Sequence, residues 1–154
     1  MLEAGQPAPS FELPDSDMHM SSSVDHLGKK NMVLFFYPKD NTPGCTIEAI
    51  EFTDFMDQFE AHDTIVFGIG KDNCVSHGHF RDEHGLTVTL LADIEGIMCN
   101  NYGVWQEKEK NGEKKMGIVR STFIVDKEGT IQHALYDVKP KGHASKVLEL
   151  VKAL

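Results

Sequence analysis

One cysteine stands where the chain passes from a strand pattern into a helix pattern. Residues 32–37 form a short apolar run that is rich in aromatic side chains, which is typical of a buried strand. Pro38 ends this run, and Thr42 is a suitable N-cap for a helix beginning at Pro43, because proline tolerates the first helical position. Cys45 then falls in the first turn, where unpaired backbone N–H groups and the helix dipole favour a thiolate. The spacing therefore predicts a reactive cysteine.

The alternative for Cys45 is an inert buried thiol, the usual state of a free cysteine. Its place directly after a Thr-Pro-Gly turn argues against this alternative. Glu48, one turn further on, has a structural explanation, because an acidic residue is favoured near a helix N-terminus. Arg120, a lone arginine before a strand pattern, would by itself be taken for a surface charge.

The segments around this cysteine alternate between strand and helix patterns. We expect strands at residues 64–70, 86–91, 121–125 and 131–138, and helices at 43–59, 74–84, 95–102 and 143–154. Residues 1–14 should be mostly extended, and the Lys/Glu-rich segment 106–117 should be a solvated loop or hairpin tip. This order predicts an α/β protein with a mixed sheet, and 154 residues suit one domain spanning 1–154.

Composition narrows the classes of function. The net charge of −9 argues against nucleic acid and anionic membrane surfaces as partners. No apolar run approaches the roughly 20 residues that a membrane span needs, and the N-terminus lacks a basic-then-apolar signal pattern. Three cysteines are few and odd in number, unlike a disulfide-framed secreted domain, so we expect a cytoplasmic location.

The residues around the cysteine also carry a resemblance. Pro38-x-x-x-Thr42-x-x-Cys45 resembles the active-site pattern of the peroxiredoxins, and Thr42 to Thr46 with Glu48 and Ala49 is similar to their bacterioferritin comigratory protein (peroxiredoxin Q) branch. Three further stretches resemble the family in the expected order, namely residues 5–13, 102–105 and 120–126. The resemblance covers nearly the whole chain. It implies a thioredoxin-like fold with a central mixed β-sheet flanked by helices and an N-terminal extension.

The same resemblance implies a thiol-dependent peroxidase that reduces hydrogen peroxide and small organic hydroperoxides and needs no metal, haem, flavin or other cofactor. Cys45 would attack the O–O bond and become a sulfenic acid. Thr42, nearby backbone N–H groups and Arg120, which matches the family's active-site arginine, would hold the peroxide oxygens, while Pro38 would shield the thiolate. Electrons would come from thioredoxin, glutaredoxin or a small thiol. The resemblance also suggests a monomer or a weak dimer.

The chain departs from many members of this branch at the second, resolving cysteine. Many carry it five residues after the first, where this chain has Ile50 and where the two positions lie roughly 140° apart around a helix. Another subgroup carries it in the next helix, near Arg81 here. Cys74 lies two turns earlier in that helix, after a strand whose end should adjoin the Cys45 loop, so it is a possible resolving cysteine. We favour direct reduction by an external thiol, and we expect Cys99 to be a buried small side chain.

Two other functions remain as alternatives. A disulfide oxidoreductase on the same fold would need a Cys-x-x-Cys pair, which the sequence lacks. A redox-sensing binding module without peroxidase activity would be indicated by loss of Cys45, Thr42 or Arg120, and all three are present.

A metal site also needs consideration, since one predicted helix is rich in suitable ligands. Cys74, His77, His79 and His84 match no strong zinc spacing and would be spread over several faces of that helix. We therefore expect these histidines to lie on the surface or to cap the helix.

Overall fold

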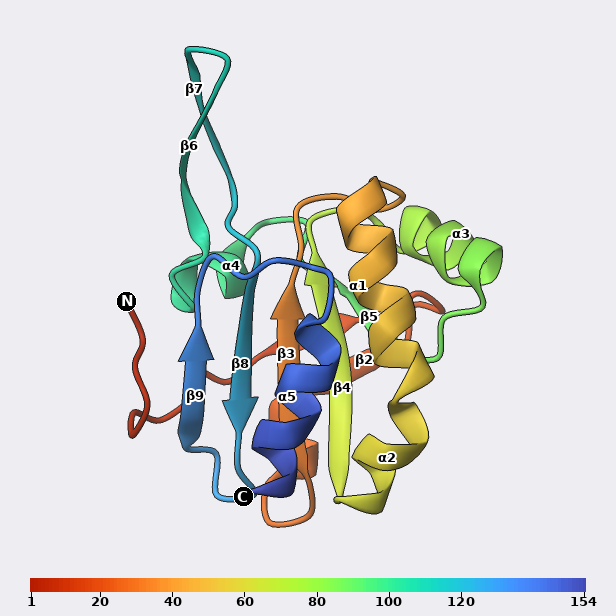
Figure 1. Ribbon diagram of the computed structural model, residues 1–154, viewed down its shortest axis with the longest axis vertical. Helices are drawn as coiled ribbons and strands as arrows, with labels where there is room; N and C mark the ends of the chain where they lie inside the picture. Colours follow the sequence, from red (N-terminus) through yellow and green to blue (C-terminus); the bar gives the residue numbers. More distant parts are fainter.

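A computed structural model of the protein describes residues 1–154 and shows a five-stranded mixed sheet flanked by helices (Figure 1). The strands of this sheet are β3 (Asn31–Phe36), β4 (Thr64–Gly70), β5 (Thr89–Ala92), β8 (Ser121–Val125) and β9 (Ile131–Leu135). Their order is β5-β4-β3-β8-β9, with β3, β4 and β5 parallel and β8 antiparallel to both of its neighbours. The mixed α/β sheet predicted from the sequence is confirmed.

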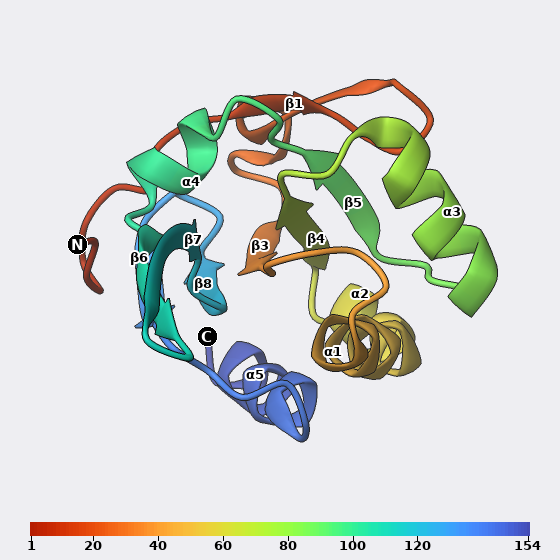
Figure 2. The same cartoon turned by 90° about the horizontal axis from the view of Figure 1, so that it is seen from above.

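Helices cover this sheet unevenly (Figure 2). The helices are α1 (Pro43–Asp54), α2 (Met56–Ala61), α3 (Cys74–His84), α4 (Ile97–Asn101) and α5 (His143–Lys152). One face carries α1, α2 and α5, and α3 lies beside β5. The other face carries α4 and the N-terminal segment with β1 (Glu12–Pro14), β2 (Met20–Ser22) and the 3-10 helix η1 (Ser23–His26). None of the helices has the length and apolar character needed to cross a membrane.

The central strand β3 is buried on both faces, which explains its continuous apolar sequence. Alternate side chains point to opposite sides. Val33 and Phe35 join one core with residues of α1 and α5, whereas Leu34 and Phe36 join a second core on the other face.

Three predicted elements differ from the structure. The strand expected over 131–138 ends at Leu135. The single helix expected over 43–59 is interrupted at Phe55, whose N–H donates to the carbonyl of Phe52, three residues back, and tightens the turn between α1 and α2. The strand expected from Leu86 starts only at Thr89. Leu86 and Val88 are nevertheless buried, so core packing of the preceding segment produced the strand-like pattern.

The charged segment after α4 is a hairpin of β6 (Trp105–Lys110) and β7 (Glu113–Ile118) that projects beyond the sheet in Figure 1. Asn111 and Gly112 form its turn, with φ of 54° and 79°. Positive φ at both central residues is typical of two-residue hairpin turns, and Asn-Gly tolerates it well. The predicted hairpin tip is confirmed.

The parallel pairing of β3 and β4 brings two segments to the same edge of the sheet. The register pairs Asn31 with Thr64 and Phe36 with Ile69, so both strands end together. The loop to α1 leaves the C-terminal end of β3, and the loop to α3 leaves the adjacent C-terminal end of β4. The expected proximity of the Cys45 loop to the start of α3 follows from this register.

Candidate active site

Cys45 lies in the first turn of α1, three residues after the N-cap Thr42. Its side chain belongs to the apolar core that contains Phe35 and Ala49, and the residue is only 1% exposed. The first backbone N–H groups of a helix have no partner within it, so the sulfur is close to unpaired donors at the positive end of the dipole. The sulfur is therefore sheltered from water but placed where negative charge is stabilised.

The Arg120 side chain contacts this sulfur from the start of β8 (Ser121–Val125). It directly precedes β8, and the antiparallel register pairs Ser121 with Phe36, the last residue of β3. The guanidinium Nη2 donates to Cys45 Sγ at 3.3 Å, and Nη1 donates to Glu48 Oε1 at 2.8 Å. One arginine thus connects the cysteine to a carboxylate one turn further along the same helix.

The electrostatics of this group are those of buried charges. Burial raises the pKa of Glu48 to about 7, although the charge and hydrogen bond of Arg120 oppose the rise. Burial alone would lower the pKa of Arg120, but the negative charges of Glu48 and Cys45 outweigh it and raise that pKa. Glu48 Oε2 is buried without a hydrogen-bond partner. The arginine therefore remains charged, whereas Glu48 changes charge near neutral pH.

The position of the guanidinium is also fixed by packing. A Cβ added to Gly44 would lie 3.1 Å from Nη2 of Arg120 and 3.3 Å from Cγ of Pro140. The backbone N–H of Val138 donates to the carbonyl of Arg120 at 3.0 Å. A glycine before Cys45 thus leaves just enough space for the arginine and the loop before α5.

Thr42 occupies the predicted N-cap position, but its hydroxyl does not cap the helix. The hydroxyl donates instead to the carbonyl of Lys39 at 2.8 Å, and the Thr42 carbonyl accepts from the Thr46 hydroxyl at 2.8 Å. The predicted N-cap position of Thr42 is confirmed, but the capping hydrogen bond is not made, because the hydroxyl is turned toward the Lys39 carbonyl and its oxygen accepts from no N–H group of α1. Pro38, partly exposed, begins this turn directly after the buried Tyr37.

The other two cysteines have different surroundings, and all three are free. Cys74 is partly buried at the first position of α3, where Asn73 caps the helix by accepting from the N–H of Ser76 at 2.8 Å. Cys99 is fully buried, and burial together with Asp93 raises the pKa of its thiol far above the ordinary value. Cys99 is the buried small side chain that the sequence predicts.

One histidine of α3 corrects the expectation of surface or capping roles. His77 is fully buried, and its Nδ1 lies 2.7 Å from Asp40 in the loop before α1. Asp40, Asp72 and His77 offer ligand atoms within 4.8 Å of one another. Both carboxylate oxygens of Asp40 already accept hydrogen bonds from protein groups. The sequence pattern gave no signal for this cluster, because its members come from two different loops and a helix.

A second cation near the site was also missed. Lys108 of β6 donates to the carbonyl of Ile118 at 2.5 Å. Burial lowers the pKa of Lys108, and the charge of Arg120 lowers it further. The charged hairpin therefore contributes to the electrostatics of the site instead of being only solvated.

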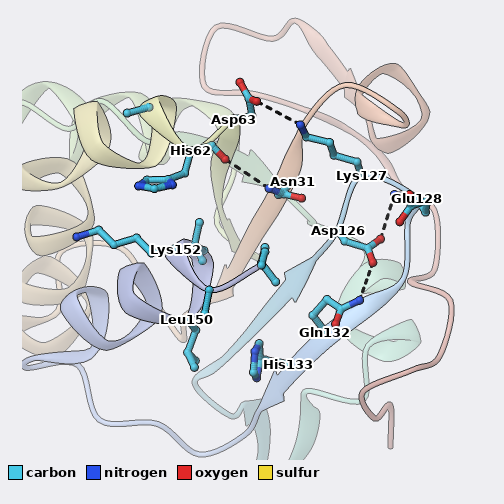
Figure 3. Close-up of a pocket in the computed structure, with 14 residues that line it drawn as sticks. Asn31, His62, Asp63, Asp126, Lys127, Glu128, Gln132, His133, Leu150 and Lys152 are labelled. Carbon is cyan, nitrogen blue, oxygen red and sulfur yellow. Dashed lines mark hydrogen bonds and ion pairs between the residues drawn. The ribbon is translucent and has the colours of Figure 1, made fainter.

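A separate cavity of about 690 Å³ lies at the opposite edge of the sheet (Figure 3). Asn31, at the start of β3, lines it together with His62, Lys127 and residues at the end of α5. Since Cys45 follows the other end of β3, the length of this six-residue strand separates the cavity from the cysteine. The cavity does not belong to the candidate site.

A thioredoxin-like α/β sheet with a sheltered cysteine at a helix N-terminus, contacted by a guanidinium, defines the class of thiol peroxidases. The family model described as the AhpC/TSA family matches residues 4–134. A putative peroxiredoxin bcp of Helicobacter pylori is 46% identical over 148 residues, covering 96% of this chain and 97% of the relative. The peroxiredoxin Bcp of Bacillus subtilis is 40% identical over 98% of this chain and 96% of its own.

Solved structures agree with these relatives. A cysteine-to-serine variant of Xylella fastidiosa PrxQ has a TM-score of 0.94 at 34% identity, covering 99% of this chain and 97% of that one. The bacterioferritin comigratory protein of Xanthomonas campestris has a TM-score of 0.88 at 34% identity, covering 93% and 90%. This chain belongs to the AhpC/TSA family of peroxiredoxins, among its Bcp and peroxiredoxin Q members, and is a thiol peroxidase.

Proposed function

We propose that Cys45 is the peroxidatic cysteine and that the protein reduces hydrogen peroxide and small organic hydroperoxides. The contact of 3.3 Å between Arg120 Nη2 and Cys45 Sγ is the observation that carries this proposal. It places a permanent positive charge against Cys45, which also lies in the first turn of α1. Cys99 lacks such a partner and is held as a thiol by burial.

The reaction transfers one oxygen to sulfur. The Cys45 thiolate attacks the outer oxygen of the peroxide, an S–O bond forms and the O–O bond breaks. The leaving oxygen takes the electron pair and then a proton, giving water from hydrogen peroxide or an alcohol from an organic hydroperoxide. Arg120 stabilises the negative charge as it moves from sulfur to the leaving oxygen.

Thr42 and Pro38 shape the approach of the peroxide. Because the Thr42 hydroxyl hydrogen is directed to Lys39, its free lone pairs are suited to accept the hydrogen of a hydroperoxide. Backbone N–H groups at the start of α1 would donate to the oxygens. Pro38, which has no N–H group, would limit the access of water to the thiolate.

The resulting sulfenic acid is reduced by thiols. A first thiol displaces water to form a mixed disulfide, and a second thiol releases Cys45 and leaves as the other half of a disulfide. Thioredoxin, glutaredoxin or a small thiol could supply these electrons. The Xanthomonas campestris relative is described as reducing alkyl peroxide, which supports organic hydroperoxides as substrates here. We further propose a monomer or weak dimer working in the reducing cytoplasm.

Direct reduction by an external thiol is preferred to an internal disulfide. Ile50 and Arg81 occupy the two positions at which members of this branch carry a second cysteine. Cys74 remains as the internal candidate, but it and Cys45 each start a separate helix.

Consumption of peroxide by the purified protein with dithiothreitol tests the proposed function. We expect Cys45→Ser to abolish turnover with an unchanged circular dichroism spectrum. The matched control is Cys99→Ala, which removes a cysteine of the opposite core and should leave turnover in place. A Cys45→Ser protein that consumed peroxide at the wild-type rate would contradict the proposal.

A further inference from the structure

Asp40 is a buried carboxylate in the loop that joins β3 to α1. It is 6% exposed and accepts hydrogen bonds from three side chains. The Tyr37 hydroxyl donates to Oδ1 at 2.7 Å, whereas the Ser76 hydroxyl and His77 Nδ1 contact Oδ2 at 2.8 and 2.7 Å. Two of the three donors therefore come from α3. The loop before the reactive cysteine is held by the neighbouring helix.

Both ring nitrogens of His77 face oxygen atoms. The ring is fully buried, with Nδ1 against the Asp40 carboxylate and Nε2 3.1 Å from the carbonyl oxygen of Leu91. The Tyr37 hydroxyl also lies 3.3 Å from Nδ1. Since the carboxylate and the carbonyl are acceptors, this geometry suits a hydrogen on each ring nitrogen, and the charge of such an imidazolium would be balanced by Asp40.

The pKa of Asp40 also depends on His77. Burial alone would raise the pKa of Asp40, but the hydrogen bond and positive charge of His77 outweigh it and hold that pKa below its ordinary value. Asp40 therefore stays negative inside the protein. The two side chains lie 2.7 Å apart with almost no access to water, and they form an ion pair when the His77 ring is protonated.

Two more contacts tie the same loop to the segment around α3. The N–H of Asp40 donates to Asp72 Oδ2 at 2.9 Å, and His84 Nε2 lies 3.0 Å from Asn41 Oδ1. Asn41 has a φ of 60°, a left-handed conformation that costs energy for a non-glycine residue and persists when its surroundings fix it. The next residue is Thr42, the N-cap of α1.

We propose that His77, acting through its ion pair with Asp40, is a positioning residue for the peroxidase reaction. The pair holds the turn that carries Thr42 and the start of α1, and so keeps Cys45 sheltered and aimed at the peroxide site. The inference rests on the proposed role of Cys45. His77 contacts neither Cys45 nor Arg120, and it acts on the loop alone.

Loss of this positioning should affect two reactions of the Cys45 sulfur in opposite directions. Attack on peroxide needs several groups in register, and a displacement of about 1 Å can cost on the order of a hundredfold in rate. Alkylation by iodoacetamide needs the thiolate and access to the sulfur, but no alignment of peroxide oxygens, and Cys45 is only 1% exposed. Loosening the loop should therefore slow the first reaction and accelerate the second.

The charge of His77 is tested first on the wild-type protein. Nuclear magnetic resonance of protein labelled with nitrogen-15 in histidine should show, near neutral pH, two protonated ring nitrogens for His77 with slowly exchanging hydrogens. The signal is assigned by its absence in His77→Gln or, if that variant does not fold, by contacts to Leu91. A single protonated nitrogen would overturn the inference. This readout does not depend on peroxide chemistry.

The positioning role is tested by rates in a Cys74→Ser background, which leaves Cys45 as the reactive thiol. His77→Gln should slow oxidation by hydrogen peroxide about tenfold or more and raise alkylation by a similar factor. His79→Gln, on an exposed position of the same helix, should change neither rate. Both rates unchanged, or both lowered, in a folded His77→Gln protein would contradict the role.

Ser76→Ala provides a milder test if His77→Gln does not fold, because it removes one hydrogen bond to Asp40 and leaves the ion pair. It should produce smaller changes in the same two directions, and no change would overturn the inference. Failure of the proposed function would instead appear as peroxide consumption that persists in Cys45→Ser. The two failures are therefore distinguishable.

Discussion

Nη2 of Arg120 lies 3.3 Å from Sγ of Cys45, although 75 residues separate them in the sequence. The antiparallel pairing of β8 with β3 makes this contact, because the start of one strand lies at the end of the other. Glu48 holds the opposite side of the guanidinium at 2.8 Å. The sulfur therefore contacts a cation whose position is set by the sheet and by a carboxylate of α1.

Arg120→Ala should slow the oxidation of Cys45 by peroxide by about a hundredfold or more, since removing one preorganised donor typically has that effect. Arg120→Lys keeps the charge but cannot contact Cys45 and Glu48 with one planar fork, so we expect an intermediate rate. Rapid-mixing measurements of Cys45 oxidation check both variants. An Arg120→Ala protein that reacts at the wild-type rate would place the arginine outside the reaction.

Gly44→Ala tests the same contact without removing any charged group. The new methyl group would lie 3.1 Å from Nη2, so the guanidinium that contacts the sulfur must move by a few tenths of an ångström. We expect a loss of peroxide rate on the order of tenfold with the helix intact, because alanine favours helices. Gly78→Ala in α3 is the matched control, since its methyl group would meet nothing nearer than 3.8 Å. Equal rates for both variants would show that the space at Gly44 is not critical.

Glu48→Gln should change how stability depends on pH. The pKa of Glu48 is about 7 in the folded protein, above the ordinary value of 4.5, so the folded state binds the proton more tightly. The wild-type free energy of unfolding should therefore fall, relative to Glu48→Gln, as pH rises from about 4.5 to about 7, by on the order of 3 kcal/mol. Urea denaturation across this range checks the difference, with Glu60→Gln on the exposed side of α2 as control. Parallel curves for wild type and Glu48→Gln would contradict it.

Local signals explain what the sequence predicted well. The apolar run of β3 and the Thr-Pro-Gly turn before Cys45 are patterns of adjacent residues. The strand, the turn and the start of the helix could therefore be predicted from the local sequence. Asn111-Gly112 likewise fixed the hairpin turn, because few residue pairs tolerate two positive φ angles. The position of Cys45 in its helix could be predicted for the same reason.

Contacts between distant segments explain what the sequence did not show. The pairing of His77 with Asp40 requires the register of β3 and β4, and no local pattern distinguishes a buried charged histidine from a surface one. Likewise, Thr42 has the residue type and position of a cap, but its hydroxyl turns to Lys39. The resemblance supplied Arg120, which local reasoning would have assigned to the surface.

Cys74 raises the last question, which is how the sulfenic acid of Cys45 is removed. A disulfide needs Cα atoms within about 7 Å, and helix starts packed side by side often miss that distance without unwinding. The start of α1 is held by the contact of Arg120 with Cys45, and the start of α3 by the Asn73 cap. These contacts favour reduction by an external thiol over an internal disulfide.

Cys74→Ser should therefore keep most of the turnover with dithiothreitol. The substitution is mild, since serine is nearly the size of cysteine and suits the first turn of a helix, so a loss of turnover would report chemistry more than folding. Non-reducing peptide mapping after one equivalent of peroxide is the decisive measurement. We expect Cys45 to be recovered as a sulfenic acid adduct of a trapping reagent, with Cys74 still a free thiol. A dominant peptide linking Cys45 to Cys74, together with lost turnover in Cys74→Ser, would instead establish a two-cysteine enzyme in which the starts of α1 and α3 unwind during each cycle.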